Sequence, residues 1–208
     1  MVSFPKIRCS TGWFTSRYFG IKSVGTENIP PTDPFIVVSN HASNLDPYII
    51  GYTSPKREVG FMAKEELFKV PVLGWIIRHC GAFPVRRGIM DEAAIQKFHD
   101  FLHAGKPLTI FVEGTRTLDG SLQPAKKGVG LLLYNAKVPV IPAYIDGTFK
   151  SMPKGRFLPR PGKITVTYGP AIPLEDLYSA IAEKATYRKI AERVTDYIGR
   201  LKPVSAAV

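Results

Sequence analysis

Short apolar runs alternate with amphipathic stretches along most of this chain. Runs rich in Val, Ile and Phe, which are typical of buried β-strands, occupy residues 35–39, 58–63, 82–86, 108–113, 139–145 and 163–168. Apolar residues at helical spacing occupy residues 46–54, 72–80, 90–104, 127–136 and 174–202. Strands that alternate with helices favour a largely parallel sheet. The pattern therefore predicts an α/β fold in which helices flank a mostly parallel, mixed central sheet.

The chain is long enough for one domain with a proper core. It has 208 residues, of which 45% are hydrophobic, as in globular proteins. The proline-rich stretch 28–34 predicts a rigid linker, so we divide the chain into an N-terminal interfacial segment with its linker, 1–33, and one domain, 34–208. Within this domain, Pro139 and Pro142 punctuate an apolar strand. Because proline lacks an N–H, this strand is expected at a sheet edge or a bulge.

The N-terminal segment mixes aromatic and basic side chains. Its aromatic residues are Trp13, Phe14, Tyr18 and Phe19, and the basic residues Arg8, Arg17 and Lys22 are interleaved with them. Phe14 and Tyr18 are four residues apart, as on one face of a helix. Such a short amphipathic helix suits a membrane interface, but it equally suits packing on the domain. The apolar stretch 68–77 is a second membrane-facing candidate that also suits the core.

The balance of charge indicates an anionic partner. The chain has 28 basic and 17 acidic residues, a net charge of +11. There is no helix-turn-helix, zinc-finger or RNP-like pattern, and the basic residues are spread out, so we expect no nucleic acid partner. An anionic membrane surface and a phosphorylated ligand fit better. A basic loop at 150–163, which contains Lys150, Lys154, Arg156 and Arg160, suits phosphates or lipid, or is an ordinary solvated loop.

Several absences guide the expected location. The sequence has no run of eighteen apolar residues, so no transmembrane helix is predicted. Its start, with Pro5 and Arg8 and no small-residue cleavage site, is unlike a signal peptide. Two cysteines, Cys9 and Cys80, are too few for a disulfide framework and suit a reducing compartment. We expect a peripheral or monotopic protein on the cytoplasmic face of the cell membrane.

Two other candidate sites were weighed. Cys80 is a possible nucleophile, but it ends an apolar stretch and suits the core of a helix. His99 and His103 have the spacing of a two-histidine metal face. With no HExxH pattern and no nearby cysteine pair, a solvated helix face fits them better. We therefore expect no metal and no cofactor.

The clearest chemical signal follows the first apolar run. His41 and Asp46 lie five residues apart in a segment that joins an expected strand to an expected helix. Loops at the carboxyl ends of strands commonly carry the chemistry of α/β folds. A carboxylate on one imidazole nitrogen holds the ring in one tautomer, so that His41 would serve as a base and Asp46 as its partner. The alternative is structural, because Asp46 followed by Pro47 also has the form of a helix N-cap.

Charged residues also end two later apolar segments. Residues 81–87 end in Arg86 and Arg87, and residues 108–117 contain the run from Glu113 to Arg116. A guanidinium is a planar cation that binds phosphate through two parallel hydrogen bonds, so these arginines suit a phosphorylated ligand. Gly114 would let the backbone pass close to such a ligand.

These segments and the proline-punctuated strand, in this order, resemble the glycerolipid acyltransferase family, and most closely the bacterial 1-acylglycerol-3-phosphate acyltransferases. The resemblance spans about residues 35–145. In this family the first motif is Asn-His-x-x-x-x-Asp, which carries the catalytic base and its partner. It falls here on Asn40, His41 and Asp46.

The same resemblance assigns the remaining motifs. The second ends in a phosphate-binding arginine, which falls on Arg86, with Arg87 as an extra candidate. The third reads Glu-Gly-Thr-Arg, and its arginine would hold the acceptor's phosphate; it falls on Glu113, Gly114, Thr115 and Arg116. The fourth, a strand around Pro142, would line the site of the acyl donor.

The implied reaction is direct acyl transfer from a thioester, acyl-CoA or acyl carrier protein, to a hydroxyl of lysophosphatidic acid. Arg86, Arg116 and Lys126 or Lys127 would hold the phosphate. Backbone amides of residues 41–46, or near Gly114, would stabilise the oxyanion. Glu113 would orient Arg116, accept a hydroxyl, or cap the strand end. Another lysolipid or glycerol 3-phosphate as acceptor, and a non-catalytic lipid-binding protein, remain as alternatives.

Overall fold

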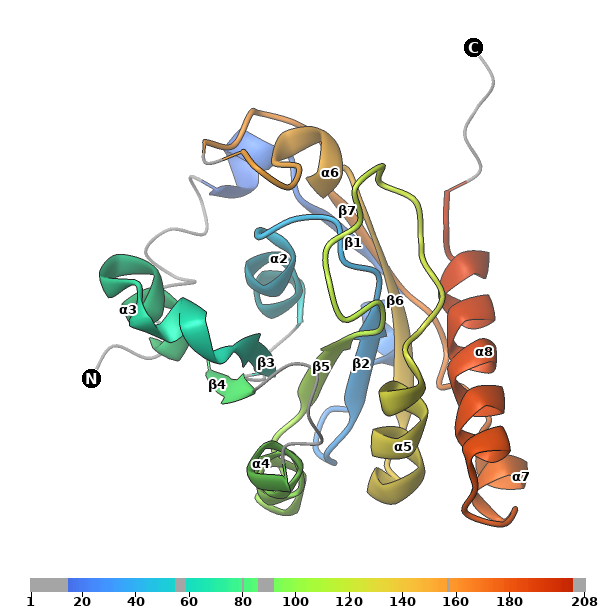
Figure 1. Cartoon of the computed structure of the whole chain (residues 1–208). Coiled ribbons are helices and arrows are strands. Elements are labelled where there is room, and N and C mark those ends of the chain that lie inside the picture. Colours follow the sequence, from blue (N-terminus) through green and yellow to red (C-terminus); the bar gives the residue numbers. More distant parts are fainter. Residues whose placement is uncertain (1–14, 55–58, 80, 86–91, 157, 204–208) are drawn as a thin grey trace.

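The computed structural model describes residues 15–54, 59–79, 81–85, 92–156 and 158–203 (Figure 1). The strands are β1 (Lys22–Val24), β2 (Ile36–Ser39), β3 (Gly60–Lys64), β4 (Ala82–Val85), β5 (Leu108–Phe111), β6 (Val140–Asp146) and β7 (Thr165–Tyr168). The helices are α2 (Asp46–Thr53), α3 (Pro71–His79), α4 (Glu92–His103), α5 (Lys127–Ala136), α6 (Thr148–Ser151), α7 (Glu175–Tyr178) and α8 (Lys184–Arg200). Two 3₁₀ turns, η1 (Thr26–Asn28) and η2 (Glu65–Lys69), complete the order.

The strands form one sheet in the order β1-β7-β6-β2-β5-β3-β4. Every pair is parallel except β6 with β7, so the two strands β1 and β7 run against the other five. The predicted α/β fold with a mostly parallel, mixed sheet is therefore confirmed. The sequence pattern did not predict β1, η1, η2 or α6, which span only three to five residues each.

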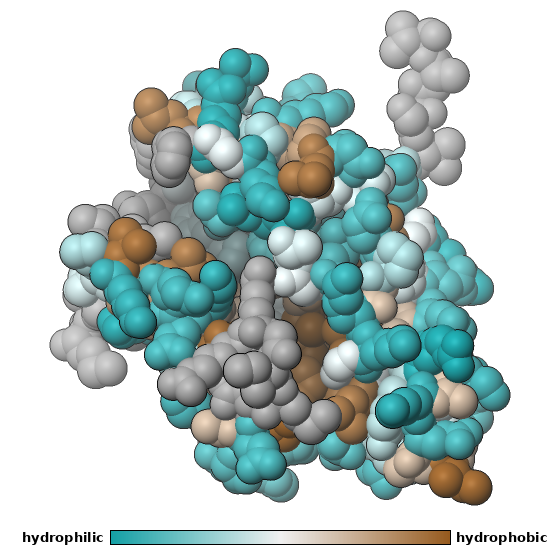
Figure 2. All heavy atoms as spheres, in the orientation of Figure 1, coloured by the Kyte–Doolittle hydropathy of each residue, from teal (hydrophilic) through white to brown (hydrophobic). Residues whose placement is uncertain are grey.

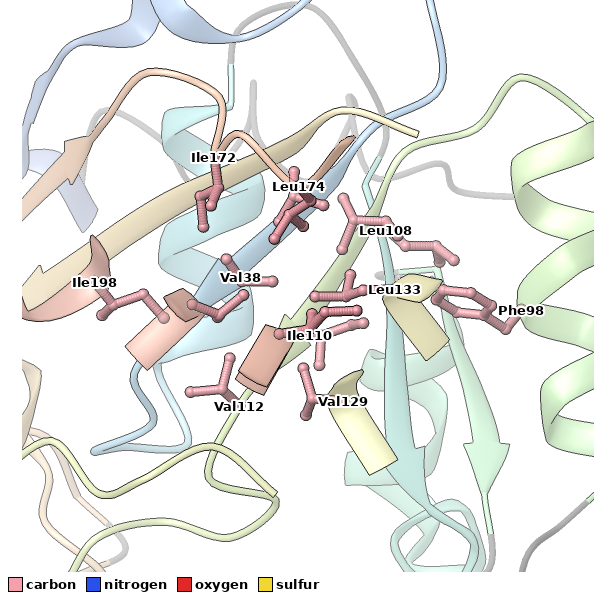
Figure 3. Close-up of a cluster of buried hydrophobic side chains, with 14 of the residues drawn as sticks. Val38, Phe98, Leu108, Ile110, Val112, Val129, Leu133, Ile172, Leu174 and Ile198 are labelled. Carbon is pink, nitrogen blue, oxygen red and sulfur yellow. The ribbon is translucent and has the colours of Figure 1, made fainter. Parts of the chain in front are cut away.

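Alternating side chains of the central strands supply a core on each face of the sheet. Ile36 and Val38 of β2 pack on one face with residues of α4, α5 and α8, whereas Phe35 and Val37 pack on the other face with α2. Figure 3 shows the first cluster, in which Leu133 of α5 lies beside the strand residue Ile110. Both faces of β2 are buried, which explains why it is a continuous apolar run.

The prediction that the proline-punctuated strand lies at a sheet edge is wrong, and its alternative, a bulge, stays a prediction. That strand is β6, which lies inside the sheet between β7 and β2. The carbonyl of Pro142 accepts a hydrogen bond from Gly169, and the pairing of β6 with β7 begins only at Ala143, opposite Tyr168. The amide of Ile172 also donates to the carbonyl of Val140, so the nitrogen of Pro142 lies between two hydrogen bonds to the chain after β7, outside the regular pairing of β6 with β7. The β2 side of the ladder needs no donor from Pro142, so the strand tolerates it.

The single helix expected over residues 174–202 is two helices, α7 and α8. Between them, Glu183 has an extended backbone, with φ −138° and ψ 166°. Leu177 of α7 and Val194 of α8 are buried in the same cluster, and the break lets both helices reach it. Residues 179–183 contain neither glycine nor proline, so nothing in the local sequence marks the break.

The N-terminal segment is part of the packed domain where the structure describes it. Residues 15–19 are helical, Phe19 is 5% exposed in the core cluster shared with Phe35, and β1 pairs with β7. The hydroxyl of Tyr18 donates to the carbonyl of Pro159. For Tyr18 and Phe19 the structure therefore favours packing on the domain over a lipid interface. Trp13 and Phe14 lie outside the described residues.

The second apolar stretch, residues 68–77, lies partly at the surface. Trp75 of α3 is 52% exposed and Val70 is 48% exposed, whereas Gly74 is buried. Among the described residues, none of the helices combines the length and apolar character needed to cross a bilayer.

Two glycines of α5 give a matched test of how closely α5 packs on α8. A Cβ at Gly130 would lie 1.9 Å from the carbonyl oxygen of Tyr187, whereas a Cβ at Gly128 would meet nothing within 4 Å. We expect Gly130→Ala to lower the free energy of unfolding by about 1–3 kcal/mol or more, because α8 must move. Gly128→Ala should leave it unchanged or raise it by up to about 1 kcal/mol. Urea denaturation of both variants measures the difference, and equal stabilities would contradict this packing.

Candidate active site

His41 and Asp46 form a hydrogen-bonded pair at the carboxyl end of β2. The distance from His41 Nδ1 to Asp46 Oδ2 is 2.8 Å. Because a carboxylate only accepts hydrogen bonds, Nδ1 is the donor in this pair, and in the neutral imidazole Nε2 is then the acceptor. The imidazole is 14% exposed and the carboxylate is fully buried. The predicted pair is therefore present, with the second ring nitrogen available to act on a substrate.

The backbone preceding α2 holds the carboxylate of Asp46 in place. Its Oδ2 also accepts hydrogen bonds from the amides of Ala42 at 2.7 Å and Ser43 at 2.8 Å. Its other oxygen, Oδ1, is buried with no hydrogen bond to any part of the chain that the structure describes. Asp46 is the first residue of α2 rather than its N-cap, a position that Leu45 occupies. The carboxylate thus points back to the histidine turn, and the N-cap alternative does not hold.

Strand register brings the other predicted residues close to this turn. Ser39 of β2 is paired with Phe111 of β5 on one side and with Ala143 of β6 on the other, so β2 and β5 end level, and β6 continues past them to Asp146. The side chain of Asn40 donates to the carbonyl of Ile145 at 2.9 Å and accepts from its amide at 2.8 Å. Asn40 thereby continues the β2–β6 ladder just before His41.

The ring of His41 stacks on Phe111, with ring centroids 4.3 Å apart and planes inclined by 21°. This contact and the hydrogen bond to Asp46 together fix the orientation of the imidazole. Sequence reasoning did not assign Phe111 to the site. Phe111 lies two residues before Glu113, which hints in the sequence that it is near the site. Only the pairing of Phe111 with Ser39 shows that the ring reaches His41.

Glu113 is hydrogen-bonded to the main chain of the same turn. Its side chain is buried, and Oε1 accepts a hydrogen bond from the backbone amide of His41 at 3.0 Å. Burial raises the pKa of the carboxyl from about 4.5 to about 7, although the amides of His41 and Gln123 oppose the rise. Of the roles predicted for Glu113, the structure shows the organising one, because Glu113 holds the main chain at His41. A contact of Glu113 with Arg116 stays a prediction.

The loop after β5 turns back on the histidine segment. Gly114 adopts a left-handed conformation with φ 67°, and the amide of Thr117 donates to the carbonyl of His41 at 2.9 Å. Thr115 is exposed and Arg116 is partly exposed. These contacts place the Glu-Gly-Thr-Arg segment beside the His41–Asp46 pair, as the sequence predicts.

Two lysines lie at the start of α5, near the same loop. A Cβ built on Gly114 would lie 3.4 Å from Cγ of Lys126, which is the N-cap residue of α5, and Lys127 is the first residue of that helix. Both lysines are exposed. The amide of Lys126 donates to the carbonyl of Val112. Lys126 thus lies within the neighbourhood of Arg116, where an anion would also meet the positive end of α5.

The remaining predicted residues are elsewhere or undescribed. Arg86, Arg87 and Cys80 lie outside the described residues. Pro142 is buried within β6. His99 and His103 lie on α4 with ring centroids 6.4 Å apart. Across the described ranges, no three histidine, cysteine or acidic side chains gather as metal ligands would.

Most backbone amides of the histidine turn are already engaged. The amide of His41 donates to the side chain of Glu113, and the amides of Ala42 and Ser43 donate to the carboxylate of Asp46. The amide of Leu45 donates to the hydroxyl of Ser43. The amide of Gly114 donates to the carbonyl of Phe111. Few of the amides that we expected to stabilise an oxyanion are therefore available to do so. Within the described part of the chain, the amides of Asn44 and Thr115 make no hydrogen bond and remain candidates.

Comparison with known families agrees with this geometry. A family model described as "Acyltransferase" matches residues 20–146, which include β1, the histidine turn and the loop after β5. A crystal structure of the 1-acyl-sn-glycerophosphate (LPA) acyltransferase PlsC from Thermotoga maritima superposes with a TM-score of 0.74 and 28% sequence identity. This match covers 97% of the present chain and 81% of the other.

Relatives with curated names were found in several kingdoms. A 1-acyl-sn-glycerol-3-phosphate acyltransferase of Chlamydomonas reinhardtii is 33% identical over 165 residues, which make up 76% of this chain and 48% of the relative. A protein of the same name from Bacillus subtilis is 26% identical over 183 residues, 88% of each chain. The chain spans about half the length, or less, of the algal and plant relatives that it matches.

The raised pKa of Glu113 makes stability depend on pH. Because the native pKa is about 7 and the ordinary value is about 4.5, the folded state holds this proton more tightly. This stabilisation of the folded state is complete when the pH is below the ordinary pKa of about 4.5. It is lost as the pH rises through the native pKa of about 7. We expect Glu113→Gln, which keeps the acceptor for the His41 amide, to remove this pH dependence. Urea titrations at about pH 5 and about pH 8 give the free energy of unfolding of wild type and of Glu113→Gln. The same change with pH in both proteins would contradict this prediction.

Proposed function

The chain belongs to the acyltransferase family, and we propose that it transfers a fatty acyl group from a thioester to the sn-2 hydroxyl of 1-acyl-sn-glycerol 3-phosphate, forming phosphatidic acid. The observation that carries this proposal is the His41–Asp46 pair, whose 2.8 Å hydrogen bond leaves Nε2 of His41 free to take a proton. The acyl donor is either acyl-CoA or an acylated carrier protein. No cofactor takes part in the proposed steps.

The reaction follows from the state of the imidazole. Nε2 of His41 removes the proton of the acceptor hydroxyl as its oxygen attacks the thioester carbonyl. The tetrahedral intermediate then collapses, the carbon–sulfur bond breaks, and the proton passes from Nε2 to the leaving thiolate. The buried carboxylate of Asp46 stabilises the imidazolium that forms between these events. The hydroxyl attacks directly, so no acyl-enzyme is required.

Recognition of the acceptor is assigned to the loop after β5 and the start of α5. Arg116 is partly exposed two residues after the left-handed turn at Gly114, where its guanidinium suits bidentate binding of a phosphate. Lys126 lies next to Gly114 and adds a second cation. Arg86 and Arg87 remain predicted ligands of the same phosphate. Holding the phosphate would place the sn-2 hydroxyl at His41, which is where most of the benefit of binding lies.

The lipid substrates and the net charge of +11 support action at an anionic membrane surface. We propose that the protein is peripheral or monotopic on the cytoplasmic face of the membrane. Lysophosphatidic acid would then be reached from the lipid layer, and the acyl donor from the aqueous side.

Replacing the base is the first test of this mechanism. His41→Ala should lower turnover at least about a hundredfold, the usual scale of general-base catalysis, and Asp46→Asn should also lower it. Thiol release from acyl-CoA in the presence of lysophosphatidate gives the rate, and a melting curve checks the fold. His99→Ala, on the surface of α4, is the control and should retain the wild-type rate. A fully active, folded His41→Ala protein would refute the assignment.

Arg116 tests which acceptor is used. Arg116→Ala should raise the apparent KM for lysophosphatidate and lower kcat, since an untethered hydroxyl is also misaligned; the combined loss should be about 1.5–3 kcal/mol. Arg116→Lys should recover only part of it, because an ammonium cannot form the two-pronged contact.

The control for this test is the dephosphorylated substrate, monoacylglycerol. Wild type should strongly prefer lysophosphatidate, and this preference should shrink in Arg116→Ala. If wild type used both acceptors equally and the variant lost both equally, Arg116 would not recognise phosphate, and a neutral or zwitterionic lysolipid would become the better candidate.

A further inference from the structure

A strongly basic loop leaves α6 on the side of the molecule that carries the histidine turn. Residues 147–163 contain five cations and no acidic residue. We call these five residues the basic ridge: Lys150, Lys154, Arg156, Arg160 and Lys163. Four are exposed, Arg156 is partly exposed, and none forms an ion pair within the part of the chain that is described. In Figure 1 this loop lies at the top, above the start of α2.

The ridge is held in a defined shape by hydrogen bonds of the chain itself. The amide of Arg160 donates to the carbonyl of Ser151 at 2.9 Å, and the side chain of Arg156 donates through Nε to the carbonyl of Leu158 at 2.9 Å. At the end of the loop, the amide of Ile164 donates to the carbonyl of Phe19. The cations are therefore displayed on an ordered loop between α6 and β7.

The base of the ridge is bonded to the active-site turn. The hydroxyl of Ser43, which lies between His41 and Asp46, donates to the carbonyl of Met152 at 2.7 Å. Ser43 is fully buried, and its amide donates to the carboxylate of Asp46. Any surface that binds the ridge is thus brought against the side of the domain that carries the His41 turn.

The composition of the ridge indicates which anion covers it. Leu158 lies between the cations and is 78% exposed. Figure 2 shows hydrophobic side chains among hydrophilic ones at that end of the molecule. Cations around a projecting apolar side chain suit a lipid surface, where the charges meet headgroups and the apolar group enters the acyl layer. A soluble acidic protein would account for the cations but not for the projecting leucine.

We propose that the basic ridge, with Leu158, is a contact surface for anionic phospholipid that presents the His41 turn to the membrane. This inference rests on the proposed use of a lipid acceptor and adds the surface through which the domain reaches it. The structure assigns this contact to a loop after β6, on which Tyr18 and Phe19 of the N-terminal segment pack.

The test compares two variants that lose the same charge. Lys154→Gln, Arg156→Gln and Arg160→Gln are combined in the ridge variant; Lys184→Gln, Arg188→Gln and Lys189→Gln are combined in the control. The three control residues are exposed on α8, whose first turn lies at the opposite end of the molecule in Figure 1. Binding is measured by co-sedimentation with phosphatidylcholine vesicles that contain phosphatidylglycerol, and with vesicles that lack it.

We expect the ridge variant to lose at least about tenfold in partitioning to the anionic vesicles, and the control to lose much less. Added salt should weaken binding of wild type more than binding of the ridge variant, because salt screens the charges that the variant lacks. Leu158→Ser should weaken binding at high salt as well. Equal losses in the two charge variants would mean that only net charge matters, and this result would overturn the proposal.

Two further outcomes would also overturn it. If the ridge variant bound vesicles normally but no longer accepted acyl groups from an acidic carrier protein, the ridge would be a protein-docking surface. If Val70→Ser with Trp75→Ser abolished vesicle binding while the ridge variant did not, the contact would be the face of α3. Co-sedimentation measures membrane binding without turnover, so it tests this proposal independently of the proposed function. The proposed function fails instead if wild type transfers no acyl group to a short-chain lysophosphatidate in solution.

Discussion

The register of three parallel strands is the constraint on which the site depends. Because Ser39 pairs with both Phe111 and Ala143, the segments that follow β2, β5 and β6 all leave the sheet at one edge. The imidazole of His41 can therefore stack on Phe111, and the amide of His41 can reach Glu113. A slip of one residue in either pairing would turn these side chains to the opposite face of the sheet. Core packing on both faces of β2 thus also determines the position of His41.

Two buried carboxylates hold His41 in different ways. Asp46 binds the imidazole and two backbone amides, so its negative charge is compensated by three donors on one oxygen. Glu113 binds the amide of His41, and burial raises its pKa to about 7. The first carboxylate fixes the ring and its tautomer, whereas the second fixes the main chain. This division explains why both acids are buried beside His41 although only one contacts the imidazole.

Local features were predictable from the sequence, and contacts between distant segments were not. His41 and Asp46 lie five residues apart in the same loop, so their hydrogen bond follows from the motif. The role of Glu113 in holding the His41 amide depends on a contact 72 residues apart, which no local pattern reveals. Pro142 was misplaced at an edge because the direction of its missing N–H depends on register. Phe111 was missed for the same reason, whereas the strand and helix positions were mostly recovered because each has its own periodicity.

The contact between Ser43 and Met152 connects the chemistry with the surface. Hydrogen bonds join the histidine turn to β6 through Asn40, and to the chain after α6 through Ser43. Both partners of these bonds, Ile145 and Met152, are buried and flank the short segment from which the basic loop begins. A displacement of that loop would therefore act on the turn that carries His41 through short, ordered segments. The same bonds thus fix where the positive charge of the loop lies relative to His41, so the position of the basic loop and the position of the histidine turn are properties of one structural unit.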